Sequence, residues 1–237
     1  MLVVDTRAVA MQRDRSQDAP SGIGLRIPGT PRAYLWFGIA TAVVLTAVYL
    51  GIEIPIRGYG VSVDPTLRRL FDLDAEATVP AYYSGAQLLV TAIAFATLGT
   101  EWTGARRRDF NIAAVALVLA SLDEIVSLHE EITTPLSRAF DFGRPFGHSW
   151  WIIPGFFLAA ALAWVLRNLL RSLGQKSARL VVVGTAVFFF GALGLESISS
   201  WFDAHSLRFM TEIAGEESAE MIGVTIVLYA VLLKIAE

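Results

Sequence analysis

Six apolar stretches of about 20 residues run through this chain, and they constrain its fold more than any other feature. Each is long enough to cross the ~30 Å hydrocarbon core of a bilayer as an α-helix, which rises about 1.5 Å per residue. The stretches cover residues 33–54, 79–100, 110–132, 150–170, 180–202 and 217–235. The sequence therefore predicts an all-α fold, a polytopic membrane helix bundle of about six transmembrane helices.

The composition agrees with a membrane class and excludes several kinds of chemistry. Hydrophobic residues make up 54% of the 237 residues and charged residues only 17%, whereas a soluble domain carries about 25% charged residues. The absence of cysteine excludes disulfides, thiolate metal ligands and cysteine nucleophiles. No basic stripe is interleaved with aromatic residues, so nucleic acid is not an expected partner. The expected partners are the lipid bilayer and a lipid or small-molecule ligand that approaches from the outer face.

The chain divides into a polar tail and an apolar domain. Residues 1–32 contain five arginines and several Gly and Pro residues, and they lack the apolar core of a cleavable signal. We therefore expect a mobile cytoplasmic tail over residues 1–32 and a six-helix transmembrane domain over residues 33–237. With the tail inside, 13 of the 19 Lys and Arg residues fall on the cytoplasmic side. This bias predicts a multipass membrane protein with both termini cytoplasmic.

The loops predicted on the outer side are long and partly apolar. Asp64 and Pro65 match the N-cap and the first-turn proline of a short helix that lies on the membrane surface. Residues 136–146 and 207–213 have a similar pattern. We expect short interfacial helices in these outer loops.

Three of the predicted transmembrane helices carry acidic residues near their outer ends. Glu196, Ser200 and Asp203 follow an i, i+4, i+7 spacing, which would align them along one helical stripe. On the third helix, the 100° periodicity would place Asp123, Ser127, Glu130 and Glu131 on one face. At about 1.5 Å per residue, the acids at positions 123, 124, 196 and 220 would lie roughly 6–13 Å inside the membrane. The sequence therefore predicts that acids from three helices meet at one depth.

A cluster of carboxylates at this depth needs compensation. Placing one charged carboxylate at the centre of a helix costs about 2.5–3.5 kcal/mol, so neighbouring acids must bind a cation, hold protons or pair with arginine. Carboxylate and imidazole ligands suit Zn, Mn or Fe, and we expect a divalent metal ion that supports a lipid-modifying or redox reaction. The predicted metal ligands are Asp123, His129, Glu130, Glu196 and Glu220, and the predicted catalytic acid/base residues are Glu124 and Glu217. The predicted site-lining residues are Glu76, Ser127, His148, Ser200, Asp203, His205 and Glu216.

Several alternatives remain open at this point. Proton- or cation-coupled transport would use the same acids, and a non-catalytic subunit or assembly factor would not need them. Pairing with Arg138, Arg144 or Arg208 would make the acids a structural lock. A haem with two histidine ligands would use His129 together with His148 or His205. A di-iron centre is disfavoured, because Val126 stands three residues before His129 where a Glu-x-x-His motif requires glutamate.

Four segments together resemble a group of bacterial multipass membrane proteins with six helices. The segments are DAEATVPAYYS (74–84), SLDEIVSLHEE (121–131), GLES (194–197) and EESAEMIG (216–223). The resemblance spans the second to the sixth predicted helix. It implies that these segments belong together and that the protein lies in the bacterial inner (plasma) membrane, and it assigns no reaction.

Overall fold

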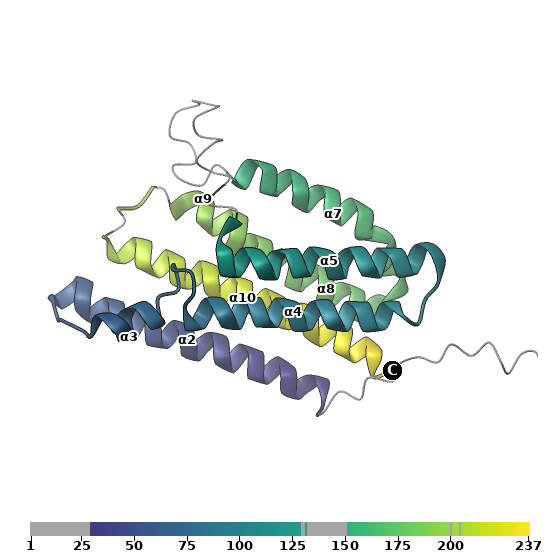
Figure 1. Cartoon of the computed structure of the whole chain (residues 1–237), viewed down its shortest axis with the longest axis horizontal. Coiled ribbons are helices and arrows are strands. Elements are labelled where there is room, and N and C mark those ends of the chain that lie inside the picture. Colours follow the sequence, from purple (N-terminus) through teal and green to yellow (C-terminus); the bar gives the residue numbers. More distant parts are fainter. Residues whose placement is uncertain (1–28, 129–130, 132–150, 200, 204) are drawn as a thin grey trace, which may run out of the picture.

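The computed structural model describes residues 29–128, 131, 151–199, 201–203 and 205–237, and every regular element among them is a helix. Of the tail predicted over residues 1–32, residues 1–28 lie outside the described residues, whereas Pro31 and Arg32 already belong to the first described helix. Figure 1 shows long helices packed side by side, with the C-terminus at one end of the bundle. The all-α prediction is therefore confirmed.

Five helical segments are long and apolar enough to cross a membrane. They are α2 (Pro31–Tyr59), α4 (Val79–Gly99), α7 (Ile152–Ser172), the run Gln175–Ile198, and α10 (Leu207–Ile235). The run comprises α8 (Gln175–Phe189), the π-helix η1 (Phe190–Leu195) and the start of α9 (Glu196–Ser199). These segments support a multipass membrane protein.

The predicted third span is the exception. Helix α5 (Gly104–Val126) has 23 residues and packs along α4, but it is not among the five segments that qualify by length and composition. Asp109 lies near its start, and Asp123 and Glu124 lie near its end. These acids leave only residues 110–122 uninterrupted by charge, so the sixth transmembrane helix is not confirmed.

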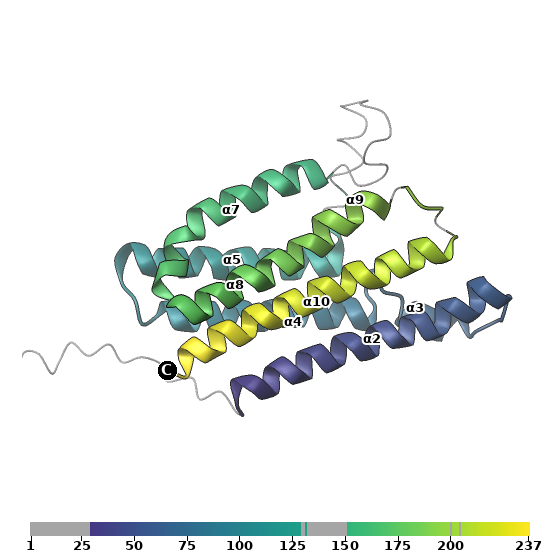
Figure 2. The same cartoon turned by 180° about the vertical axis from the view of Figure 1, so that it is seen from behind.

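The long helices alternate in direction, and α10 lies at the centre of the arrangement. It contacts α2, α4, α8, η1 and α9, and Figure 2 shows it between α2 and α8. We call the end of the bundle where α2 ends and α10 begins the acidic end, and the end where α8 begins and α10 ends the basic end. In Figure 1 the acidic end is on the left. The basic end carries Arg106, Arg107, Arg108, Arg171, Lys176, Arg179 and Lys234.

The starts of the helices follow from the local sequence. The Asp64 carboxylate accepts hydrogen bonds from the backbone N–H groups of Thr66 (2.9 Å) and Leu67 (3.0 Å), and α3 (Pro65–Leu70) begins there as predicted. Residues 207–213 were expected to form a separate interfacial helix, which is wrong. The Ser206 hydroxyl accepts a hydrogen bond from the Phe209 N–H (3.1 Å) and thereby begins α10 at Leu207. The helix predicted over residues 136–146 lies outside the described residues.

Helices α8 and α10 approach each other through glycine. A Cβ atom added to Gly184 would lie 2.6 Å from the carbonyl oxygen of Gly223, and one added to Gly223 would lie 2.6 Å from the backbone nitrogen of Phe188. Small residues are the usual means of close helix packing in membranes, because the surrounding lipid supplies no hydrophobic drive for association. This contact fixes α8, and therefore η1 and α9, against α10.

Apolar side chains fill the interior of the basic half of the bundle, and others lie on the outer surface of the bundle. Phe95, Leu98, Phe110, Leu173 and Val231 are almost fully buried in one cluster at the basic end. By contrast, the large side chains of Trp36, Phe37, Phe156, Phe157, Leu158 and Trp164 are more than 60% exposed. Exposed apolar side chains of this size on both α2 and α7 are typical of contact with lipid.

Candidate functional site

Four helices enclose a narrow polar crevice towards the acidic end of the bundle. It contains about 170 Å³ of space between atoms and has no room for a water molecule. The lining residues are Ser84, Gln87, Leu88, Glu124, Phe188, Glu220, Met221 and Val224. Glu124 on α5 and Glu220 on α10 therefore face the same space, although 96 residues separate them in the chain.

Three further glutamates lie close to this crevice. The charges of Glu124, Glu196, Glu216 and Glu217 all act on Glu220, and those of Glu124 and Glu196 act on Glu217. All five side chains are partly buried. The structure thus brings together acids from α5, α9 and α10, and we call Glu124, Glu196, Glu216, Glu217 and Glu220 the acidic cluster.

Two polar residues of α4, Ser84 and Gln87, complete the crevice, and neither is among the predicted site residues. Ser84 and Gln87 are 6% and 8% exposed. The Gln87 amide donates a hydrogen bond to the Thr225 hydroxyl (2.5 Å), whereas Gln87 Oε1 and Ser84 Oγ have no hydrogen-bond partner within the described part of the chain. Buried polar atoms are nearly always hydrogen-bonded. Ser84 and Gln87 thus each leave one buried oxygen without a hydrogen-bond partner among the described residues.

An irregular turn of helix carries Glu196 into the acidic cluster. The π-helix η1 ends immediately before Glu196, and a Cβ atom added to Gly191 of η1 would lie 2.7 Å from the carbonyl oxygen of Glu216. The Trp151 indole N–H donates a hydrogen bond to Glu196 Oε1 (2.7 Å), which orients this carboxylate. Single π-turns occur frequently at functional sites.

The acidic stripe predicted on the fifth helix does not form. Helix α9 ends at Ser199, so Asp203 does not continue the face that carries Glu196. Asp203 is exposed in the following turn, where its carboxylate accepts a hydrogen bond from the backbone N–H of His205 (2.8 Å), and His205 is exposed as well. Four predicted site residues lie outside the described residues, namely His129, Glu130, His148 and Ser200.

The predicted face at the end of the third helix is also interrupted. Ser127 is buried and adopts a left-handed conformation (φ 46°), and its N–H donates to the Asp123 carbonyl oxygen (2.6 Å). Helix α5 therefore ends at Val126, and the 100° periodicity cannot be extended to residue 131. Asp123 is partly buried, but Glu124 is the acid of this pair that lines the crevice. Glu76 is exposed in the loop before the Thr78 N-cap and is not part of the first turn of α4.

A second charged group at the acidic end holds α3 against α2. Glu53 is 2% exposed, and its carboxylate binds Arg57 Nε at 2.7 Å, Arg68 Nε at 2.5 Å and Arg68 Nη2 at 3.0 Å. The sequence analysis missed this group, although Glu53 and Arg57 have the i, i+4 spacing of a helical ion pair. This group is separate from the lock considered for the clustered acids: Arg208 forms no ion pair with another described residue, and Arg138 and Arg144 lie outside the described residues. In the adjoining loop, partial burial raises the pKa of Asp72, and the Glu53 charge adds to this effect.

The side chains of the acidic cluster do not converge at the spacing of metal ligands. No three His, Asp or Glu side chains of the described residues are close enough together to hold a metal ion. The donors that face the crevice are all oxygens, from Ser84, Gln87, Glu124 and Glu220. Because like-charged carboxylates repel one another, they spread apart unless a cation or protons lie between them.

The fold and the site define a multipass helical membrane protein with acids gathered between its helices. The chain belongs to the family described as a domain of unknown function (DUF8692), which matches residues 36–235. In comparisons with curated proteins and with solved structures, no match was found. The match includes all four segments on which the family resemblance was based.

Proposed function

We propose that the protein is a multipass protein of the bacterial inner membrane with both termini in the cytoplasm. The charge distribution between the two ends of the bundle supports this orientation. Basic residues at the starts of α5 and α8 and at the ends of α7 and α10 gather at one end, as expected for the cytoplasmic side. The acidic cluster then lies in the outer half of the membrane, within reach of molecules from the outer face.

We further propose that the acidic cluster binds a divalent metal ion. The observation that carries this proposal is the crevice, where Glu124 and Glu220 meet the unpartnered oxygens of Ser84 and Gln87. A cation would satisfy these oxygens and neutralise the carboxylates, whereas an apolar ligand would do neither. Binding requires the glutamate side chains to change rotamer and converge, since they do not meet at metal-ligand spacing as they stand.

The donor set narrows the choice of metal. Oxygen ligands favour hard cations, so Mn²⁺ is the preferred ion among Zn, Mn and Fe. In this proposal Glu124, Glu196 and Glu220 are ligands, and Glu217 is the acid/base residue. A bound ion would polarise a substrate oxygen or acidify a water molecule. The substrate is a lipid or small molecule that enters from the outer leaflet, and the reaction is lipid modification or a redox step.

Metal content tests this proposal directly. Protein purified in detergent after growth with Mn, Fe and Zn should contain stoichiometric metal by elemental analysis. Glu124→Gln and Glu220→Gln should lose it, because each removes a charged ligand from the crevice. Glu76→Gln removes the same charge from an exposed loop residue and should retain the metal. Wild-type protein without stoichiometric metal would overturn the proposal, and so would equal loss in all three variants.

One observation favours a second candidate, a proton-coupled function. The crevice has no room for a water molecule, so Glu124 and Glu220 can stay close together if they hold protons. Transport would then require the bundle to open, because the apolar cluster around Phe95, Leu98 and Phe110 closes the basic half. Metal-free protein in proteoliposomes that carries a proton-driven flux, lost in Glu196→Gln, would favour this candidate over metal binding.

A further inference from the structure

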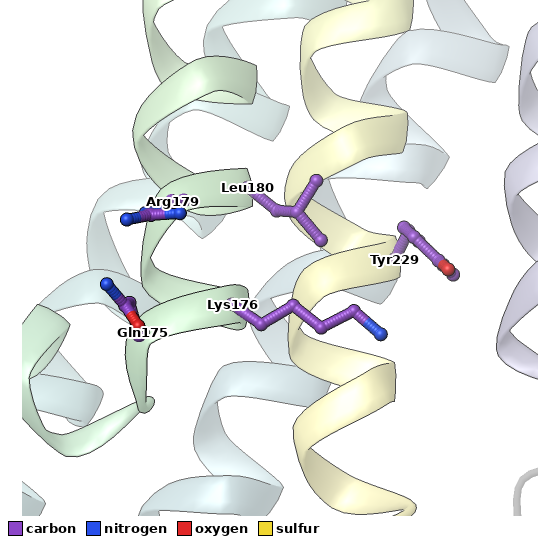
Figure 3. A pocket seen from close by; sticks show the side chains of 5 residues that line it. All are labelled: Gln175, Lys176, Arg179, Leu180 and Tyr229. Carbon is purple, nitrogen blue, oxygen red and sulfur yellow. The ribbon is translucent and has the colours of Figure 1, made fainter.

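We infer that a pocket at the basic end, between α8 and α10, binds the phosphate group of an anionic phospholipid. The pocket has a volume of about 430 Å³ and is lined by Gln175, Lys176, Arg179, Leu180 and Tyr229. Figure 3 shows Lys176 reaching from α8 across α10 towards Tyr229, with Leu180 between the two helices. This inference rests on the membrane placement proposed above and is independent of the acidic cluster.

The charge of the pocket suits an anion. Lys176 and Arg179 are exposed, and neither forms an ion pair with another residue that the structure describes. Glu237 is the nearby acid whose charge is felt by Lys176, and it is already paired with Lys234 at 2.8 Å. The pocket therefore keeps an excess of positive charge.

The start of α8 adds hydrogen-bond donors to this charge. Gly174 is the N-cap residue, and among the described residues no side chain caps the helix. The first backbone N–H groups of a helix lack intrahelical partners and carry a partial positive charge, which favours an anion at this position. Tyr229 lies on the side to which Lys176 points (Figure 3), and its hydroxyl can donate to a phosphate oxygen bound there.

The position of the pocket points to a lipid as the source of the phosphate. One spanning segment begins beside the pocket and another ends a few residues beyond it, so the pocket lies at the depth of the lipid headgroups. Leu180 and the ring of Tyr229 provide an apolar wall for the part of the lipid below its phosphate. A soluble phosphate ion would make no use of that wall.

Titration with defined lipids tests the inference. Full-length protein in detergent is titrated with phosphatidylglycerol or phosphatidylcholine and followed by native mass spectrometry. The variant Lys176→Gln/Arg179→Gln should bind phosphatidylglycerol about 25-fold more weakly than wild type, from roughly a fivefold effect of each basic side chain. Arg32→Gln/Arg107→Gln removes the same charge from exposed residues of the basic end outside the pocket and should retain wild-type binding.

Three results would overturn the inference. Equal weakening in both double variants would show that the lipid responds only to net charge. Equal binding of phosphatidylglycerol and phosphatidylcholine would show that no anion is recognised. Displacement of the lipid by millimolar inorganic phosphate would assign the pocket to a soluble anion. Unchanged thermal unfolding of each variant verifies that the fold is intact. Reaction of Lys176→Cys with a membrane-impermeant thiol reagent in inside-out vesicles, measured separately, distinguishes failure here from failure of the proposed membrane placement.

Discussion

Arg68→Ala should destabilise the detergent-solubilised protein by about 2 kcal/mol, because it removes two of the three contacts that hold the buried Glu53 carboxylate and leaves Arg57 as its partner. Weakening the compensation of a buried charge costs more than losing an exposed ion pair. The same change should release α3 from α2. Chemical denaturation and limited proteolysis between α2 and α4 would measure the two effects.

Arg69 provides a matched control for this prediction. It is the next residue in α3, and it is exposed with no ion pair to another described residue. Arg69→Ala should therefore leave stability nearly unchanged. The triple variant Glu53→Leu/Arg57→Leu/Arg68→Leu should recover much of the loss, since apolar replacements for all three members of the group leave no buried charge. Similar losses for Arg68→Ala and Arg69→Ala would show that the Glu53 group does not stabilise the fold.

Glu220→Gln should have opposite effects with and without metal. In the presence of a chelator the variant should be more stable than wild type, because one of several neighbouring like charges has been removed. With Mn²⁺ at about 1,000 times its Kd, wild type should gain about 4 kcal/mol, and the variant should gain little. Thermal unfolding with EDTA and with MnCl₂ measures both effects on the same samples.

The effect of Glu220→Gln on stability should thus change sign when Mn²⁺ is added. This change of sign distinguishes a metal-binding cluster from one that only stabilises the fold. Residues that bind a ligand are commonly placed at a cost to the stability of the free protein. Glu76→Gln should show neither effect, because Glu76 is exposed outside the cluster. If Mn²⁺ stabilised Glu220→Gln as strongly as wild type, Glu220 would not be a ligand.

The sequence predicted those parts of the fold that depend on local signals. Runs of apolar residues gave the spanning helices, and Asp64 with Pro65 gave the start of α3. The start of α10 was misplaced, because acids at positions 212, 216 and 217 resemble a polar loop. In the structure these acids belong to a continuous helix that packs against α2, α4 and α8. Contacts with the neighbouring helices thus stabilise α10 as one helix across the acidic segment, where composition alone predicted a break.

The proximity of the acids also followed from a local signal, and their role as a site stays a prediction. Acids at similar depth on separate helices indicated that Glu124, Glu196 and Glu220 would approach one another, and the structure brings them together. The left-handed turn at Ser127 and the π-helix before Glu196 break the regular α-helical periodicity. The residues after each irregularity therefore do not lie on the helix faces that a 100° repeat predicts. Irregular backbone of this kind depends on packing across helices and has no strong local signal in the sequence.

Ser84 and Gln87 show that uncharged polar residues also line the crevice. They lie three residues apart in the otherwise apolar α4, and Thr91 follows four residues later. This spacing places polar groups on one helical face, which in a membrane helix points towards the bundle interior. The signal was present in the sequence, but only the crevice shows that the two residues face Glu124 and Glu220.

Cysteine cross-linking tests most directly whether Glu124 and Glu220, on separate helices, face one crevice. The chain contains no cysteine, so Glu124→Cys/Glu220→Cys introduces the only two thiols. A short bifunctional thiol reagent should join them within one chain, which mass spectrometry of the digested protein would detect. Glu101→Cys/Glu220→Cys places the first thiol beyond the opposite end of α4 and should not cross-link. Single-site thiol reagents should first show that both pairs of cysteines react. Equal cross-linking of the two pairs, or no cross-linking of either, would then contradict the shared site.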